Sequence, residues 1–422
     1  MRYIKLCKKE IQNNLMLYLF IMLQSIVVFI AIILGVSIFM QRYEKYLSIK
    51  KLLGDDGVIV ASQHLFLAGE NPDNILCGEN SEISELFSNA DVKSSYQAWC
   101  SYELGGGLDS DNIEGIIYDS DIVEAYKPQI ERGRWLQNKD CDSNVIEAVI
   151  TPNDLNLDVG SVFYITKAAD ESPLPEKITV EIVGVLADNA DIIHNGVNPF
   201  NGPDKDLRDC YFRYSSEYFN KPYIMYIKDD LNSTEYEMFG RRYISTPAVE
   251  RIQFISFDGL SEEDISNIND CLKSPKCTTN NMIEMDEFTV NSKAYIWSQL
   301  NEIIPVFIGL LLLVFTSVVC VSALTTKNQL RNYAVYYILG LKWNDCVKIQ
   351  CLQQVLLQLT AFIITIAGYL FVYFTDVLKD TVINVGIPQL TGCFIYLVFV
   401  ALISVIMPYS ILKKKTPKTI MT

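Results

Sequence analysis

The sequence IIPVFIGLLLLVFTSVVCVSAL, residues 303–324, contains no charged side chain in 22 consecutive positions. About 20 apolar residues in a helix are enough to cross a hydrocarbon core roughly 30 Å thick. Three further runs share this property, at Leu15–Met40, Leu352–Phe374 and Thr391–Leu412. The sequence therefore predicts a multi-pass α-helical membrane protein with four transmembrane helices.

A long segment of ordinary globular composition separates the first two apolar runs. We predict one large α+β extracytoplasmic domain there, between helices 1 and 2. The first run is longer than the roughly 7–15 apolar residues of a signal peptide and no small-residue cleavage site follows, so we interpret it as a retained anchor. Helical patterns continue past the first span and precede the second, which predicts two helical stalks.

The predicted organisation follows from these boundaries. It comprises a cytoplasmic N-terminal tail (1–14), transmembrane helix 1 and its stalk (15–53), the extracytoplasmic domain (54–290), a stalk with transmembrane helix 2 (291–324), a cytoplasmic coupling segment (325–351), transmembrane helix 3 (352–374), a short extracytoplasmic loop (375–390), transmembrane helix 4 (391–412) and a cytoplasmic tail (413–422).

Basic residues predict the orientation of the chain. Lysine and arginine gather in the N-terminal tail, in the loop between the second and third spans and in the C-terminal tail, whereas the loop between the third and fourth spans holds only Lys379 beside Asp376 and Asp380. Because cytoplasmic loops carry an excess of lysine and arginine, we expect both termini to be cytoplasmic and the large domain to lie outside.

Acidic side chains dominate the predicted outer domain. Residues 41–301 hold 22 basic and 45 acidic side chains. Such a surface disfavours nucleic acid and attracts cations or cationic peptides, although the solubility of an exposed domain is the preferred explanation of the charge. Stretches rich in β-branched and aromatic residues predict strands, clustered between about 145 and 187, and Ser261-x-x-Asp264 predicts a capped helix. Residues 189–221, rich in Asn, Asp, Gly and Pro, predict a long loop.

Six of the eleven cysteines fall in the predicted outer domain. An oxidising compartment permits disulfides among them, with fifteen possible connectivities. Cys271 and Cys277 flank a Ser-Pro-Lys turn and form the candidate pair. A zinc site has little support, because the chain has only two histidines and no C-x-x-C spacing.

The chain carries no recognisable catalytic or nucleotide-binding motif. It contains no G-x-x-x-x-G-K-[ST], no G-x-G-x-x-G after a strand and no H-E-x-x-H. The apolar runs also lack the ionisable residues that ion-coupled transporters need, and their strongest polar groups are Gln24, Gln354 and Gln358. We expect these glutamines to form hydrogen bonds between helices. Because the motifs above are absent, we expect the chain to be a non-catalytic subunit with no cofactor of its own.

Residues 331–357, RNYAVYYILGLKWNDCVKIQCLQQVLL, resemble the cytoplasmic segment after the second span of MacB/FtsX-like ABC transporter permeases, the mechanotransmission type. Gly340 stands where a left-handed residue would cap the preceding helix. Asn332, Tyr337 and Lys342 depart from the usual Glu, Arg and Ser or Thr. The positions that fit are Arg331, Tyr333, Ala334, Val335, Leu339 and Gly340.

A second similarity lies in the predicted outer domain. IERGRWLQNKDCDSNVIEAVITPNDLNLDVGSVFYIT (130–166) followed by ITVEIVGVLAD (178–188) resembles the outer core of the same family. The basic, proline-containing tail and the order of spans also match. The residues that carry the outer-core motif are Gly133, Arg134, Leu157, Gly160, Val183, Gly184 and Val185.

The resemblance implies a permease subunit of the bacterial cytoplasmic membrane that works as a dimer, with a second copy or a paralogue. ATP and magnesium would bind to a separate cytoplasmic ATPase dimer, whose hydrolysis moves the outer domain through the stalks. The residues it implies for contact with the ATPase are Arg331, Asn332, Tyr333, Val335, Tyr336, Ile338, Gly340 and Lys342. Tyr333, Tyr336 and Tyr337 share one helix face, the tyrosine face. Either this face packs on the protein's own spans and Arg331, Val335 and Ile338 meet the ATPase, or the reverse holds.

Four functions are consistent with the sequence. The first is export of, or resistance to, peptides, lipopeptides or antibiotics, with a peptide or lipid-like substrate. The second is FtsX-like signalling that activates a cell-wall hydrolase or a sensor, an extracellular effector. A membrane-anchored receptor without an ATPase leaves the third and fourth spans unexplained, and an outer-facing enzyme has no motif to support it.

Overall fold

The structure is a computed structural model of the 422-residue chain. It describes residues 11–12, 15–64, 90–103, 112–137, 145–166, 177–194, 200, 205–214, 222–227, 249–272, 280–374 and 385–413. The chain forms two compact units. One, the helical unit, combines Met1–Tyr43 with Ile296–Thr422, and the other, the outer unit, comprises Glu44–Tyr295.

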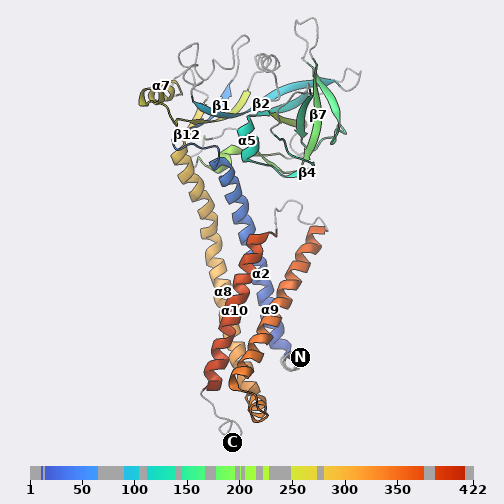
Figure 1. The fold of residues 1–422 in the computed structure, drawn as a ribbon, viewed down its shortest axis with the longest axis vertical. Coiled ribbons are helices and arrows are strands. Elements are labelled where there is room, and N and C mark those ends of the chain that lie inside the picture. The colour runs from blue at the N-terminus through green and yellow to red at the C-terminus, as the bar shows by residue number, and fades with distance from the viewer. Residues whose placement is uncertain are drawn as a thin grey trace. The chain divides into compact units, whose positions relative to one another are not determined.

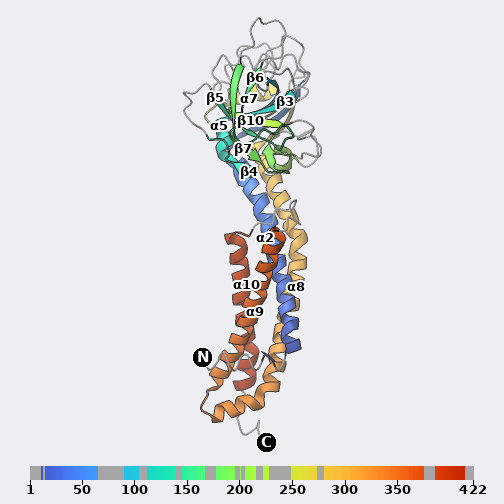
Figure 2. The ribbon, with the colours of Figure 1, turned by 90° about the vertical axis from the view of Figure 1, so that its right-hand side faces the viewer.

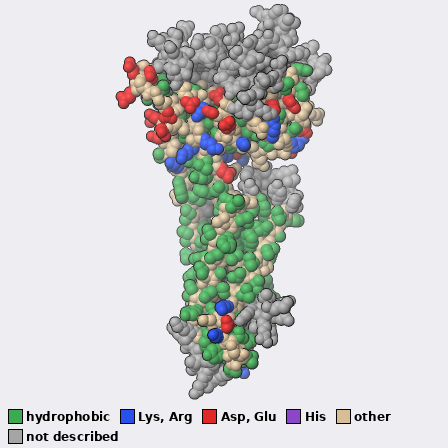
Figure 3. Space-filling model, in the orientation of Figure 1, with side chains coloured by type: hydrophobic (Ala, Val, Ile, Leu, Met, Phe, Trp, Pro, Cys, Tyr) green, Lys and Arg blue, Asp and Glu red, His purple; other side chains and the backbone are tan. Residues whose placement is uncertain are grey.

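The helical unit is built from long apolar helices. They are α2 (Leu15–Lys50), α8 (Met285–Ile338), α9 (Trp343–Phe374) and α10 (Ile387–Lys413) (Figure 1). Among the described residues, these four helices are long and apolar enough to cross a membrane, which confirms the four predicted spans. Their core joins Phe29 of α2, Val318 of α8, Ala361 of α9 and Tyr396 of α10. The face of this unit seen in Figure 3 is largely hydrophobic.

One helix replaces three predicted segments. The second stalk, the second span and most of the coupling segment form the single 54-residue helix α8, about 80 Å long. The predicted coupling segment (325–351) is therefore divided between the end of α8, the turn that follows it and the start of α9. Residues 325–338 contain neither glycine nor proline, so no helix-breaking residue ends the helix before Ile338.

The outer unit is centred on a sheet that closes on itself. In the described residues, β2 (Asp91–Glu103), β3 (Asn112–Tyr118), β10 (Tyr223–Ile227), β5 (Val145–Ile150), β7 (Lys177–Leu186) and β6 (Val162–Thr166) pair in this order, and β6 pairs back to β2. Most of these pairs are antiparallel, but β3–β10 and β5–β7 are parallel. Ile117, Ile150, Phe163, Ile182 and Ile224 fill the interior of the ring.

Further elements extend this ring of strands, which we call the barrel. Beyond β2, the sheet continues through β11 (Val249–Ser256), β1 (Gly57–His64) and β12 (Asn280–Glu284). Strand β4 (Ile130–Gly133) pairs with the end of β7 that β6 leaves free (Figures 1 and 2). Helix α7 (Glu262–Leu272) packs Ile268 against the apolar face of β1 and β11. The short helix α5 (Ser120–Ala125) follows β3.

The structure confirms one local prediction of the sequence and corrects another. Ser261 and Asp264 cap α7 reciprocally, since the Asp264 amide donates to Ser261 Oγ (3.2 Å) and the Ser261 amide to Asp264 Oδ2 (3.4 Å). Residues 189–221 were predicted as one long loop. They contain instead the antiparallel pair β8 (Asp191–Ile193) and β9 (Tyr211–Arg213), with the short 3-10 helix η1 (Leu207–Cys210) between them.

The candidate disulfide cannot be placed on the described side chains. Cys277 lies outside the described residues, and of Cys271 only the backbone is described. Cys210, another of the six outer cysteines, is a buried free thiol. Burial raises the pKa of the Cys210 thiol well above its ordinary value, so this group stays protonated and unreactive.

Candidate functional site

The turn between α8 and α9 has a well-defined local geometry. Gly340 adopts a φ of 96° and its amide donates to the carbonyl of Tyr337 (3.0 Å). The amide of Leu341 donates to the carbonyl of Tyr336, also at 3.0 Å. This pair of bonds is the Schellman motif, which confirms that Gly340 caps the preceding helix. Residues 331–346 thus form a tight helical hairpin, which we call the inner hairpin.

Helix α9 begins immediately after this turn. Lys342 occupies the N-cap position, and its amide donates to the carboxylate of Asp345 (3.2 Å). Lys348 lies 3.4 Å from the same carboxylate. The side chain of Asp345 therefore supplies half of a capping box, although the cap residue itself has no suitable oxygen. Lys342 stood out in the sequence as an unusual residue, whereas the compensating role of Asp345 was not predicted.

One face of the inner hairpin packs against the helices of its own chain. Tyr333 and Ala334 are completely buried. Tyr333 packs with Cys346 and Val347 of α9 and with Leu412 of α10. Its hydroxyl donates to Oε1 of Gln329 at 2.5 Å. Tyr336 is half-buried beside the same cluster. The tyrosine face therefore contributes to packing within the chain.

A buried hydrogen-bond network joins α8 to α9 just above this cluster. Nε2 of Gln350 donates to Oγ1 of Thr325 (2.7 Å) and to the carbonyl of Ser322 (3.1 Å). Oε1 of Gln350 accepts from the hydroxyl of Thr326 (2.8 Å). Gln350 is fully buried and uses both ends of its amide, so it fixes the register of the two helices. Gln350 was not among the residues predicted to form hydrogen bonds between helices.

The predicted glutamines behave differently from one another. Nε2 of Gln358 donates to Ser25 Oγ at 2.8 Å, which confirms a hydrogen bond between α9 and α2. Gln354 is fully buried, but neither polar atom of its amide has a partner among the described residues. Gln350, Gln354 and Gln358 stand four residues apart and so share one face of α9. This four-residue spacing is the sequence pattern from which a role for Gln350 could have been predicted.

The opposite face of the inner hairpin is exposed and apolar. Val335, Ile338 and Leu339 expose 43%, 63% and 74% of their surface. Tyr337 stacks on Trp343 across the turn, with ring centroids 4.9 Å apart. Arg331, Asn332 and Lys342 are also exposed. Of the two arrangements left open by the sequence, the structure has Tyr333 and Tyr336 packed within the chain and Arg331, Val335 and Ile338 accessible. The third tyrosine, Tyr337, is 41% exposed.

The residues of the outer-core motif have structural roles. Gly133 of β4 lies opposite Gly184 of β7. A Cβ built on Gly184 would collide with the carbonyl oxygen of Arg134, and one on Gly133 would collide with the carbonyl of Val183. The two strands therefore approach closely only because both residues are glycine. Arg134 also holds Glu147 of β5, with a nitrogen–oxygen distance of 2.5 Å.

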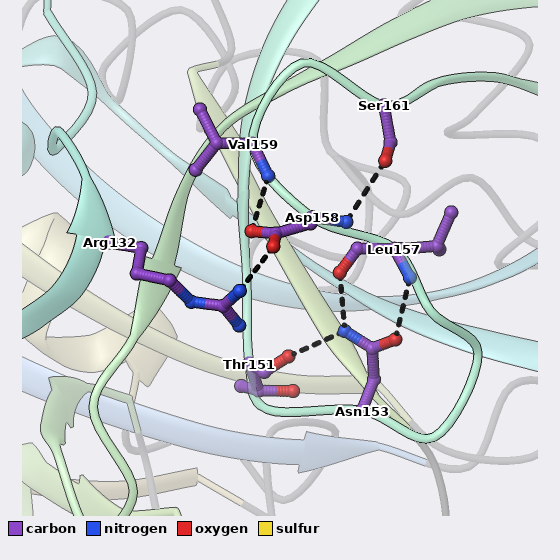
Figure 4. A network of polar contacts seen from close by, with 7 residues as sticks. All are labelled: Arg132, Thr151, Asn153, Leu157, Asp158, Val159 and Ser161. Atoms are coloured by element: carbon purple, nitrogen blue, oxygen red, sulfur yellow. Dashed lines mark hydrogen bonds and ion pairs between the residues drawn. The ribbon is translucent and has the colours of Figure 1, made fainter.

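The loop between β5 and β6 is organised by Asn153 (Figure 4). Its Oδ1 accepts from the amides of Leu155 (3.1 Å) and Leu157 (3.2 Å), and its Nδ2 donates to the Leu157 carbonyl (3.1 Å). Asp158 forms an ion pair with Arg132 of the β4 strand. Gly160 follows with a φ of 84°. The motif thus forms a braced turn, and its residues gather around β4 and β7 rather than around a ligand site.

The described residues show no centre for metal chemistry. Within them, no three His, Cys, Asp or Glu side chains lie close enough to hold a metal ion. The strongest candidate for a functional surface is therefore the exposed face of the inner hairpin.

Comparisons with known proteins give structural matches alone. No protein-family model matches the sequence, and no curated protein matches it. The chain is similar to the extracellular domain of the ABC-type transporter YknZ from Gram-positive bacteria, with 11% identity and a TM-score of 0.26 over 53% of this chain and 99% of that one. It is also similar to the periplasmic region of MacB from Actinobacillus actinomycetemcomitans, with 12% identity and a TM-score of 0.26 over 60% of this chain and 98% of that one. The two matched structures are thus an extracellular domain and a periplasmic region.

Proposed function

We propose that this chain is the permease subunit of an ABC transporter and converts ATP hydrolysis by a separate ATPase into movement of its outer unit. One observation carries the proposal. The end of the 54-residue helix α8 presents an exposed apolar stripe, Val335, Ile338 and Leu339, on a hairpin that is rigidly packed on its other side.

The stripe has the properties of a docking surface for a protein. Arg331, Val335 and Ile338 follow helical spacing, so they form one continuous face. Exposed apolar residues that cluster beside charged ones mark protein–protein contacts more often than isolated apolar residues do. Burial of Val335, Ile338 and Leu339 by a partner would contribute about 1.5–3 kcal/mol for each fully buried side chain.

The hairpin is built to pass on a displacement. The Schellman turn, the Tyr337–Trp343 stack and the Gln350 network tie the end of α8 to the start of α9. A push on the stripe would therefore shift both helices together, and α8 continues without interruption to Met285. ATP and magnesium belong in this account to the partner ATPase, which works as a dimer and so implies two permease chains.

We place the work of the transporter outside the membrane. The predicted spans carry no ionisable residue that could couple ion movement to transport. The outer domain, which is acidic, is the part of the chain that would meet a substrate. Export of, or resistance to, cationic peptides, lipopeptides or antibiotics is the function that these properties favour.

The test begins with recovery of the ATPase. The full chain, purified from its native membrane, is expected to bring with it a separate ATPase carrying a G-x-x-x-x-G-K-[ST] loop. Ile338→Asp places a charge in the middle of the stripe and should reduce recovery of that ATPase by about tenfold or more, because a charge cannot be buried without a partner.

Val290→Asp is the matched control. Val290 is 65% exposed, similar to Ile338, but lies in the outer unit. It should leave ATPase recovery unchanged. Recovery of an ATPase that is insensitive to Ile338→Asp would exclude the stripe as the contact, and absence of any ATPase would exclude the function itself.

A further inference from the structure

A short segment of the outer unit contacts both helices that enter this unit. The segment Lys205–Arg213 contains η1 and β9, and we call it the clasp. It touches the end of α2 near Lys45 and the start of α8 near Asn291 and Tyr295. These contacts all lie within the outer unit, which begins at Glu44 and ends at Tyr295.

The contacts with α2 converge on Lys45. Its Nζ lies 2.6 Å from the carboxylate of Asp191, and the two side chains are only 21% and 14% exposed. The hydroxyl of Tyr211 donates to the carbonyl of Lys45 at 2.9 Å, and Lys45 Nζ lies 5.2 Å from the centre of the Tyr211 ring. Asp191 pairs with Arg213 across the β8–β9 ladder. One end of the clasp is therefore held to α2 by the hydrogen bond from Tyr211 to Lys45, and the neighbouring strand β8 adds the partly desolvated, charge-assisted contact between Asp191 and Lys45.

The tyrosines near this contact remain hydrogen-bond donors. Tyr126 donates to the carbonyl of Asp191 at 3.0 Å, and its ring lies 5.0 Å from that of Tyr211. Burial is the main cause that raises the pKa of the Tyr126 and Tyr211 phenols. Both hydroxyls therefore keep their protons over the physiological range and remain hydrogen-bond donors there.

The contacts with α8 come from the other end of the clasp. Nδ2 of Asn291 donates to the carbonyl of Lys205 at 3.0 Å. Lys205 Nζ donates to the carbonyl of Met282, at 3.0 Å, just before the helix begins. The guanidinium of Arg208 lies 4.7 Å from the centre of the Tyr295 ring, a cation–π distance.

The clasp itself is stiff. The carboxylate of Asp206 is 3% exposed and accepts from the amide of Arg208 (2.9 Å), while Asp209 accepts from the amide of Asp206 (3.1 Å). This reciprocal capping fixes η1. Leu207 and Cys210 point inward and are buried. A segment fixed in this way cannot absorb a displacement at one end without passing it to the other.

We propose that the clasp is the joint that fastens α2 and α8 to one another and, through the ring contact of Phe212 with Tyr223 of β10 (centroids 6.4 Å apart), to the barrel. The proposal rests on the proposed function for its purpose, because a movement of the helices would reach the barrel through this joint. The structural claim itself does not depend on that function. It states that the end of α2 and the start of α8 are stabilised cooperatively by Lys205–Arg213.

Hydrogen exchange of the purified full chain in nanodiscs, without nucleotide or ATPase, tests the proposal. Tyr211→Phe removes the hydrogen bond to Lys45 and keeps the ring. A lost hydrogen bond of this kind should speed local amide exchange by about three- to tenfold. The proposal requires that this increase appears in residues 285–295 of α8 as well as in residues 44–50 of α2.

A second variant and two controls complete the experiment. Lys45→Met removes the ion pair and should produce the same two-site increase, whereas Lys45→Arg keeps the charge and should restore protection. Arg132→Met removes an exposed ion pair on the far side of β4 and should change neither helix. If exchange rises in 44–50 alone, the two helices are anchored independently and the proposal is wrong. If no ATPase co-purifies with the chain, the proposed function is wrong, but the expected change in hydrogen exchange of α2 and α8 stays the same.

Discussion

At the scale of single residues, glycines decide how closely the strands of the outer unit approach. Gly184 has ordinary backbone angles, so only space restricts it, whereas Gly160 has open space around it and a positive φ. Gly184→Ala should therefore force β4 and β7 apart and cost about 3 kcal/mol of unfolding free energy. Gly160→Ala, the control, should cost about 1 kcal/mol. Urea titration of the full chain, followed by tryptophan fluorescence, measures both, and equal losses would contradict the steric argument.

Asp258 makes the outer unit sensitive to acid. Its carboxylate accepts from Ser256 Oγ (2.7 Å) and from the amide of Asp55 (3.3 Å), and the hydrogen bond from Ser256 is the main cause that lowers its pKa. Because the pKa is lower in the folded than in the unfolded state, the contribution to stability is complete above the unfolded value of about 3.9. It is lost as the pH falls through the folded pKa.

The corresponding measurement compares the unfolding free energy at two pH values. The native chain should be less stable at a pH of about 3 than at about 5. Asp258→Asn preserves the shape of the side chain but cannot bind the proton, so the difference between the two pH values should shrink. An unchanged difference would show that other carboxylates account for the acid sensitivity.

At the scale of elements, the sequence predicted the helices better than their ends. Charge-free runs of about 20 residues are a strong signal because an isolated charge in a membrane is costly. The fusion of three predicted segments into α8 was missed, since the change from apolar to polar composition at Leu324 marks the membrane boundary and not the end of a helix. The closing of the barrel by β6 and β2 was also missed, because pairing between distant strands leaves no local pattern.

The glutamines of α9 give a prediction that belongs to this scale. Gln350 bonds to α8 through both ends of its amide, whereas Gln354 has no partner among the described residues. Gln350→Leu should lose about 1 kcal/mol, since this is the typical net contribution of an intramolecular hydrogen bond. Gln354→Leu should be neutral or stabilising, because it removes a buried polar group without partners.

Thermal unfolding of the two variants in the same detergent distinguishes these effects. The expected order of midpoints is Gln350→Leu below the native chain, and Gln354→Leu equal to it or above it. The reverse order would indicate that Gln354 has a water or lipid partner and that Gln350 does not hold the hairpin.

At the scale of the whole molecule, the sequence placed the candidate coupling residues in one stretch but could not show which of them are buried and which are exposed. Tyr333, which carries a hydroxyl, is buried, whereas the more hydrophobic Ile338 is 63% exposed, so hydropathy alone would place the two side chains wrongly. The difference arises from α10, whose Leu412 covers the tyrosine face and lies far away in the sequence. Tyr336→Asp would therefore disturb packing as well as docking, which makes Ile338→Asp the sharper test of contact.

The continuity of α8 gives the last prediction. Under the proposed function, a displacement at the inner hairpin travels along this helix to the outer unit. Lys293 and Ala294 are exposed and adjacent, so changing both to glycine weakens the helix by about 1 kcal/mol for each glycine without disturbing a buried contact. ATP hydrolysis in the complex should persist, whereas the ATP-dependent change in hydrogen exchange of the outer unit should fall. Lys293→Ala, with Ala294 retained, keeps the helix intact and should preserve that change. If the double-glycine variant responds to ATP like the native chain, the movement reaches the outer unit by another route, and a continuous α8 is not required for coupling.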